Sequence, residues 1–193
     1  MNLLAHCYLS GEFDEVMVGN LMGDFVKGKP AEKLSEDIKF GIHLHRKIDS
    51  FTDSHPIVRE SKSRLFPTYR HYSSVIVDVF YDHFLASCWL DYSKIPLIDY
   101  AKKVYLLLED KYQTLPTSMQ RMFFYMQTQN WLLNYAKLDG IEKTLLGMKE
   151  RASFDSGMEY AIKDLKKDYQ LYLTDFTEFF PLLVQYVKVL KAS

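Results

Sequence analysis

Apolar residues recur at spacings of three and four positions along most of the chain, which is the pattern of amphipathic α-helices. Strict alternation of apolar and polar residues over the length of a strand is hard to find. The eight glycines and six prolines are thinly spread and separate the helical stretches. We therefore predict an all-α fold in which residues 1–193 form a single-domain helical bundle.

Eight helices are expected from this periodicity and from the positions of cap residues and prolines. Ser35 is expected to be the N-cap of the second of them. The segment from Thr68 to Trp89 is apolar on nearly all sides, which predicts a buried central helix. Pro181 is expected to end or kink the last helix, because proline lacks the N–H group that a helix uses. In chain order, the helices are predicted near residues 12–26, 35–52, between Pro56 and Pro67, at 68–89, and onward from Pro96, Pro116, Asp139 and Ser156.

Charge and composition exclude several classes of protein. The chain has 24 Lys+Arg against 25 Asp+Glu, so no basic excess indicates binding of nucleic acid. A hydrophobic share of 48% argues against disorder. Cys7 and Cys88 form no CxxC pair, so neither a disulfide framework nor a cysteine-based zinc site is indicated. Without a secretory signal or a run of about 18 apolar residues, we expect a soluble, cytoplasmic protein that does not enter a membrane.

The histidines are distributed unevenly. All six lie in the first 83 residues, and residues 84–193 contain none. This asymmetry predicts that residues 1–92 carry the chemistry and that residues 93–193 form a helical scaffold. His6 lies in an apolar stretch before the first predicted helix, where a core histidine bonded to a backbone carbonyl is the simplest interpretation. It becomes a candidate ligand if the N-terminal segment folds against the other polar residues.

Two segments combine carboxylates with histidines at helical spacing. In GIHLHRKIDSFTDSHP, residues 41–56, His45, Asp49 and Asp53 follow one another at intervals of four and form one stripe. Imidazole and carboxylate groups bind Mn²⁺, Mg²⁺ or Zn²⁺, although the stripe could also be a solvated polar face. In GNLMGDFVKG, residues 19–28, Asp24 could cap the helix, pair with Lys27 or bind a metal.

A third segment, DVFYDHFLASCW, places acidic groups on a strongly apolar helix at residues 78–89. Asp78 and Asp82 lie four positions apart and share a face, and His83 follows directly. Two buried carboxylates need a cation or a proton, which a metal ion or an arginine could supply. His83 by itself is expected to be a core histidine with satisfied hydrogen bonds.

Residues 56–73 are locally basic in a chain that is otherwise nearly neutral. This segment includes Arg59, Lys62 and Arg64. Beside a carboxylate site, such a patch can steer an acidic substrate, although it could equally be an ordinary solvated face. The chain contains no GxxxxGK[ST], GxGxxG, HExxH, GxSxG or ExxH motif.

The order and spacing of NLLAH at the start and of the three segments above resemble the acyl carrier protein phosphodiesterase family, over roughly residues 2–89. The resemblance implies an all-helical fold distantly related to the HD-domain phosphohydrolases. The His-Asp dipeptide of those enzymes is absent here, where the chain has His45-Arg46 and, reversed, Asp82-His83. The remaining C-terminal half resembles the family only in length and helical character.

The resemblance also implies an activity, with Mn²⁺ as cofactor and Mg²⁺ as the alternative. Water would cleave the phosphodiester between 4′-phosphopantetheine and a serine of holo-acyl carrier protein, an acidic partner of fatty acid and lipid metabolism. Asp53 or His55 would accept the proton of the water or orient the metal ligands, and Arg46 would neutralise charge on the phosphoryl oxygens. The metal ligands implied are Asp24, His45, Asp49, Asp82 and His6.

Two other functions stay open on sequence grounds. The same chemistry could serve a phosphohydrolase that acts on small nucleotides or other phosphoesters. A non-catalytic helical protein could instead bind a carrier protein without turning it over, in which case no metal is required. The oligomeric state is not predicted.

Overall fold

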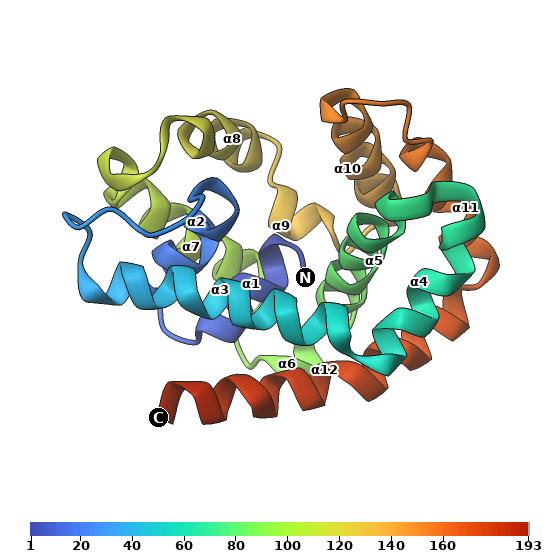
Figure 1. Cartoon of the computed structure of the whole chain (residues 1–193), viewed down its shortest axis with the longest axis horizontal. Helices are drawn as coiled ribbons and strands as arrows, with labels where there is room; N and C mark the ends of the chain where they lie inside the picture. The colour runs from blue at the N-terminus through green and yellow to red at the C-terminus, as the bar shows by residue number, and fades with distance from the viewer. Residues whose placement is uncertain (193) are drawn as a thin grey trace.

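The computed structural model describes residues 1–192. Within this range the chain forms helices and no strand, which confirms the predicted all-α class (Figure 1). Four short 3-10 turns, η1 to η4, join the helices at Gly23–Phe25, Arg70–Tyr72, Tyr112–Thr114 and Met158–Tyr160. The α-helices are α1 Leu3–Ser10, α2 Glu15–Met22, α3 Glu36–Ser54, α4 Pro56–Tyr69, α5 Ser73–Ser87, α6 Trp89–Tyr92, α7 Leu97–Asp110, α8 Thr117–Thr128, α9 Trp131–Asn134, α10 Leu138–Arg151, α11 Ala161–Lys167 and α12 Tyr169–Ala192.

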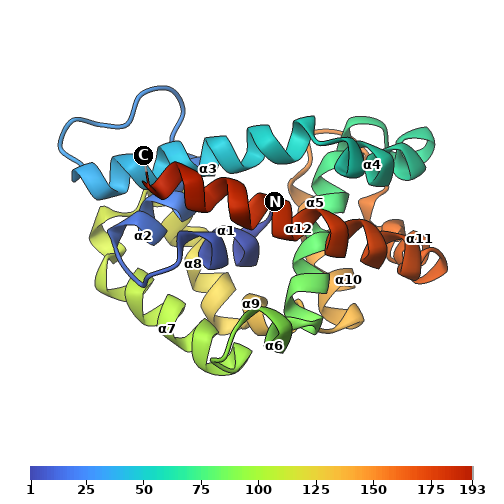
Figure 2. The same ribbon diagram turned by 90° about the horizontal axis from the view of Figure 1, so that it is seen from below.

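The two longest helices, α3 and α12, pack against each other along one side of the molecule (Figure 2). In Figure 1, α8 and α10 lie on the side away from α12, and the N-terminus lies between these layers. The buried apolar residues form one cluster, to which every α-helix contributes. Among residues 1–192, no helix combines the length and the apolar character that a membrane span requires.

Helix α5 is the central helix that the sequence predicts. Eleven of its residues are buried, and it contacts α1, α4, α10 and α12. It begins at Ser73, later than predicted, because α4 continues through Pro67 to Tyr69. The prediction that the preceding segment ends before Pro67 is therefore wrong. Pro67 lies on the exposed face of the last turn of α4, while Leu65 and Tyr69 are buried and hold that turn in place.

Two further boundaries differ from the predictions. Helix α12 does not end at Pro181, because Phe180 and Leu183 on either side of it are buried against the core. The first predicted helix begins at Glu15, after an N-cap at Asp14, and an unpredicted helix, α1, precedes it. At Pro181 tertiary packing outweighs the local signal. The start of α2 is instead set locally, because the Asp14 carboxylate accepts hydrogen bonds from the backbone N–H groups of Val16 and Met17.

Helices α2 and α3 approach closely enough to exclude side chains between them. A Cβ added to Gly19 would collide with the carbonyl oxygen of Ile38, and one added to Gly41 would collide with that of Val16. The predicted N-cap of α3 is confirmed, since the Ser35 hydroxyl accepts a hydrogen bond from a backbone N–H. This close packing sets the polar residues of α2 and α3 beside one another.

Candidate metal centre

His6 reaches the middle of the molecule because a buried carboxylate anchors α1. Asp82 on α5 is fully buried, and it accepts hydrogen bonds from the backbone N–H groups of Leu4, at 2.7 Å, and Ala5, at 3.1 Å. These donors belong to the first turn of α1 and have no acceptor within the helix. Burial raises the pKa of Asp82 to about 7, although the two N–H groups oppose the shift. Asp82 therefore fixes the position of α1 and of His6.

A hydrogen-bond network determines which ring nitrogen of His6 carries the proton. The Ser10 hydroxyl donates to the carbonyl oxygen of His6, and Asn20 Nδ2 donates to that oxygen and to Ser10 Oγ. Asn20 Oδ1 consequently faces His6 Nδ1 at 2.8 Å. Because an amide oxygen can only accept, we assign the proton to Nδ1, which leaves a lone pair on Nε2. Burial lowers the pKa of His6 and so favours this neutral ring.

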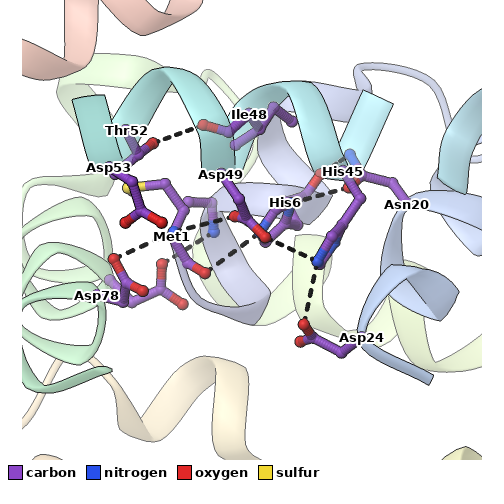
Figure 3. Close-up of polar contacts among 12 residues, drawn as sticks. Met1, His6, Asn20, Asp24, His45, Ile48, Asp49, Thr52, Asp53 and Asp78 are labelled. Carbon is purple, nitrogen blue, oxygen red and sulfur yellow. Dashed lines mark hydrogen bonds and ion pairs between the residues drawn. The ribbon is translucent and has the colours of Figure 1, made fainter. Parts of the chain in front are cut away.

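Helix α3 brings a second imidazole and a carboxylate to the same place. His45 Nε2 lies 3.0 Å from Asp49 Oδ2 and 3.2 Å from Asp24 Oδ1 (Figure 3). The ring of His45 stacks on that of His6, with 4.0 Å between centroids. His6 Nε2 lies 3.2 Å from Asp49 Oδ1. Gly23 makes room for this arrangement, because a Cβ there would collide with the His45 side chain.

The pKa values in this cluster are strongly coupled. Burial alone would raise the pKa of Asp49, but the contacts with His45 and His6 and the charge of the N-terminal amine hold it well below its usual range. The hydrogen bond with His45 lowers the pKa of Asp24. Burial would lower the pKa of His45, but Asp24 and Asp49 raise it to about 9. The cluster therefore holds ionised carboxylates that attract positive charge to His45.

The N-terminal amino group adds to this charge balance. It lies 3.1 Å from Asp78 Oδ1 and 3.4 Å from Asp49 Oδ1, and it is fully buried (Figure 3). Burial lowers the pKa of this Met1 amine, but Asp78 and Asp49 raise it to about 10. Burial raises the pKa of Asp78, and the amine opposes that effect. Asp78 is thus paired with the amine at the edge of the cluster.

The donor set fits a divalent cation. One ligand atom each from His6, His45 and Asp49 lies within 4.8 Å of the others, the one such group of three among residues 1–192. The Nε2 lone pair of His6 faces Asp49 Oδ1 and the carbonyl oxygen of Met1, each 3.2 Å away. Neither oxygen can donate, so a cation or a proton must lie between these three acceptors. Imidazole nitrogen combined with carboxylate oxygen suits Mn²⁺ or Zn²⁺ and, with more oxygen ligands, Mg²⁺.

The structure brings four of the five predicted ligands together. His6, His45 and Asp49 form the group of three, and Asp24 lies against His45. Asp82 has both carboxylate oxygens on the backbone of α1 instead. The spacing of four between His45 and Asp49 made their pairing predictable, whereas the role of Asp82 depends on α1, which was not predicted.

The two predicted proton acceptors lie at the C-terminal end of α3. Asp53 is exposed and accepts a hydrogen bond from Lys62 Nζ at 2.7 Å. The half-buried ring of His55 packs against the rings of Phe51 and Phe179, with centroids 5.5 and 5.0 Å away. Neither side chain belongs to the group of three donors described above.

Arg46 holds the loop that follows the Asp24 turn. Its Nη2 donates to the carbonyl oxygens of Val26, at 2.8 Å, and Gly28, at 2.6 Å. Gly28 adopts a positive φ of 72°, which suits a glycine. The guanidinium therefore fixes the segment that carries Asp24.

The predicted basic segment is largely paired with acids. Arg59 is exposed, but Lys62 binds Asp53, and Arg64 binds the carboxylate of Asp175 on α12. Arg64 also lies 5.5 Å from the ring centroid of Tyr172. Of the three predicted substrate-binding cations, Arg59 is the one most available to a partner.

A cavity of about 890 Å³ adjoins the centre and was not predicted from the sequence. Asn2, Leu3 and Asp24 line part of it, and the rest of the wall comes from residues 122–151. The half of the chain that the sequence predicts as scaffold thus supplies most of this wall. The available signal is a row of small residues on α10, at Gly140, Thr144 and Gly147, which recur at helical spacing.

His83 is a buried core histidine, as expected from the sequence. Its Nδ1 lies 2.8 Å from the carbonyl oxygen of Tyr135, and its Nε2 lies 3.0 Å from the hydroxyl of Tyr169. Nδ1 must donate to the carbonyl, and Nε2 then accepts from the hydroxyl, so the ring is neutral. Burial lowers the pKa of His83 below its ordinary value.

This lowered pKa predicts a loss of stability in acid. In the unfolded chain His83 takes up a proton near pH 6.5, whereas in the folded protein it stays neutral there. Its contribution to the free energy of unfolding is therefore complete above pH 6.5 and is lost as the pH falls below that value. Wild type should therefore lose more unfolding free energy than His83→Gln between pH 7.5 and 5.5, by up to about 1 kcal/mol. Urea titrations measure this, with the exposed His43→Gln as control. Equal losses in wild type and His83→Gln would contradict the assignment.

The fold and the site together define an all-helical protein with a candidate centre for a divalent metal ion. The family model for acyl carrier protein phosphodiesterase matches residues 1–183. Relatives named acyl carrier protein phosphodiesterase include one from Photorhabdus laumondii, 32% identical over 96% of this chain and 94% of its own, and one from Pectobacterium atrosepticum, 32% identical over 97% and 98%. A relative of the same name from Shigella boydii is 34% identical over 95% and 96%.

The chain therefore belongs to the acyl carrier protein phosphodiesterase family. No solved structure matches it. The match covers the second half of the chain as well as the four segments on which the resemblance rests.

Proposed function

We propose that this protein is a metal-dependent phosphodiesterase that acts on holo-acyl carrier protein. Water adds to the phosphorus of the phosphodiester, the bond from phosphorus to the serine oxygen breaks, and that oxygen leaves with a proton. The products are apo-acyl carrier protein and 4′-phosphopantetheine. The observation that carries the metal dependence is the lone pair of His6 Nε2, which faces a carboxylate and a carbonyl oxygen.

His6, His45 and Asp49 are the residues that would hold the ion, with Asp24 beside them. We favour Mn²⁺, with Mg²⁺ as the alternative, because carboxylates accompany the imidazoles. A divalent ion at this position would polarise phosphoryl oxygens and acidify water. Asn20 keeps the proton of His6 on Nδ1, and Asp82 keeps α1 in place.

Other residues have roles that follow from where they lie. Asp53 could accept the proton of the water only after turning away from Lys62, and His55 only after leaving its aromatic contacts. Arg46 acts first as an anchor of the Asp24 loop, and charge neutralisation at the phosphoryl group would require it to release that loop. We therefore propose that these three residues support the site through the contacts described above. Their direct catalytic roles stay predictions.

The proposed partner is an acidic carrier protein. Arg59 and the neighbouring basic residues of α4 are the surface that we propose for its recognition, and no nucleic acid or membrane is involved. We propose one domain over residues 1–193, with an HD-domain-like core, in which residues 1–92 provide the metal site. A cytoplasmic location fits a reaction on this carrier protein.

Intact-mass spectrometry of holo-acyl carrier protein tests the proposed function. The carrier protein should lose the mass of 4′-phosphopantetheine in the presence of this protein and Mn²⁺, and should keep it when EDTA is added. Loss of mass with EDTA present would remove the metal from the proposal. Bound Mn²⁺ with an unchanged carrier protein would favour another phosphoester as substrate, and no bound metal would favour a non-catalytic binding protein.

A further inference from the structure

Helix α10 presents small side chains to the cavity of about 890 Å³. Thr144 and Gly147 both line it, three positions apart on one face. A Cβ added to Gly147 would meet, among the described residues, only the guanidinium of Arg151, 3.9 Å away. Glycine within a helix lowers helix stability by about 1 kcal/mol relative to alanine. The missing side chain at Gly147 leaves open space on the cavity side of α10.

The opposite wall combines apolar surface with amide groups. Met122 of α8 and Trp131 of α9 supply apolar area, and Gln129 and Asn134 supply amides that can both donate and accept. Asn2 adds a third amide at the start of α1. The volume lies within the range of roughly 300–1,000 Å³ that is typical of small-molecule sites. Lys143, Glu150 and Arg151 also line the cavity, and all three are exposed to solvent. The apolar and amide part of the wall suits a slender, uncharged chain that contains both methyl and amide groups.

The cavity borders the metal centre at Asp24. Asp24 lines the cavity, and the same carboxylate lies 3.2 Å from His45 Nε2. A group held beside His45 therefore has the cavity directly next to it. From Gly140 to Gly147, the α10 wall extends over about 10 Å, so an elongated molecule can continue from this end along the helix.

We propose that this cavity binds the pantetheine arm of the substrate, with the phosphodiester at the Asp24 end and the arm lying along α10. This inference rests on the proposed function. The arm is an uncharged chain with a geminal dimethyl group, a hydroxyl, two amides and a terminal thiol. Its methyl groups match Met122 and Trp131, and its amides match Gln129 and Asn134. The second half of the chain thereby determines which phosphodiester is cleaved.

Tryptophan fluorescence provides the first test. Trp131 lines the cavity, whereas Trp89, the second tryptophan, is buried elsewhere and bonded to the carbonyl oxygen of Ile95. Pantetheine should change the emission of the wild-type protein in a saturable way at concentrations up to about 10 mM. The change should be lost in Trp131→Phe. Adenosine in place of pantetheine should give no saturable change, and a response to adenosine alone would overturn the proposal in favour of a nucleotide site.

Filling the cavity provides the second test. Gly147→Trp should lower kcat/KM for holo-acyl carrier protein at least about tenfold, equivalent to about 1.4 kcal/mol. Hydrolysis of bis(4-nitrophenyl) phosphate, which lacks the arm, should stay within about twofold of wild type under the same relation. Glu142→Trp is the matched control, because Glu142 is exposed on the same helix and does not line the cavity. Helical circular dichroism establishes that both variants are folded.

The outcomes separate this inference from the proposed function. If wild-type protein leaves holo-acyl carrier protein intact, the proposed function fails, whatever pantetheine does to Trp131. If wild type cleaves the carrier protein and Gly147→Trp cleaves it equally well, the arm lies elsewhere and the inference fails alone. If Gly147→Trp does not fold, the fluorescence response of Trp131 in the wild-type protein tests the inference. A saturable response to pantetheine supports it, and the absence of one overturns it.

Discussion

Replacing Asp49 by asparagine should abolish Mn²⁺ binding and lower phosphodiesterase activity by roughly 10³-fold or more. Asp49 is the residue on which the centre converges, since His6 and His45 both direct Nε2 at its carboxylate, from 3.2 and 3.0 Å. The amide keeps the shape of the side chain but removes its charge and replaces one acceptor by a donor. That donor would face the imidazole of His6 or His45. Isothermal titration with Mn²⁺ and the mass-spectrometric assay measure the two effects.

The control for this variant is Asp37→Asn on the same helix. Asp37 lies in the exposed first turn of α3, so Asp37→Asn makes the same chemical change at a distance from the centre. It should bind Mn²⁺ and cleave holo-acyl carrier protein as wild type does. Activity of Asp49→Asn within tenfold of wild type, or its recovery with excess Mn²⁺, would show that Asp49 is no metal ligand.

Part of this centre is encoded locally and was therefore predictable. His45 and Asp49 lie one helical turn apart, so any helix over α3 places them together. The amphipathic periodicity of α3 and the N-cap at Ser35 are strong local signals, and both are confirmed. The strongly apolar character of residues 68–89 likewise predicted the buried central helix, which is α5.

The rest depends on contacts between distant parts of the chain. Helix α1 has only eight residues, too few to be stable by propensity alone, and it is held by Asp82 across 78 positions of sequence. The partners of Asp53 and Arg64 likewise come from other helices. The cavity requires α8, α9 and α10 to lie beside Asp24, which no periodicity specifies. Such arrangements depend on packing between distant parts of the chain, which short-range sequence patterns do not predict.

Replacing Asp82 by alanine should impair the protein in a different way from replacing Asp49, by lowering its stability and displacing His6. The change leaves the buried N–H groups of Leu4 and Ala5 without their acceptors, which should lower the unfolding free energy by about 2–4 kcal/mol. Helix α1 would no longer be held at its first turn, so His6 would lose its fixed position. Urea titration measures the loss of stability, and titration with Mn²⁺ measures the effect on the centre.

The response to excess metal decides whether Asp82 positions α1 or binds the ion itself. If it positions α1, Asp82→Ala should bind Mn²⁺ about tenfold more weakly, and saturating Mn²⁺ should restore most of the activity, because binding of the ion favours the ordered arrangement of His6. Asp82→Asn keeps one acceptor oxygen for the N–H group of Leu4 or Ala5 and should fall between alanine and wild type. If Asp82 is a ligand, saturating Mn²⁺ should restore neither variant. Because both carboxylate oxygens already accept from α1, we expect restoration.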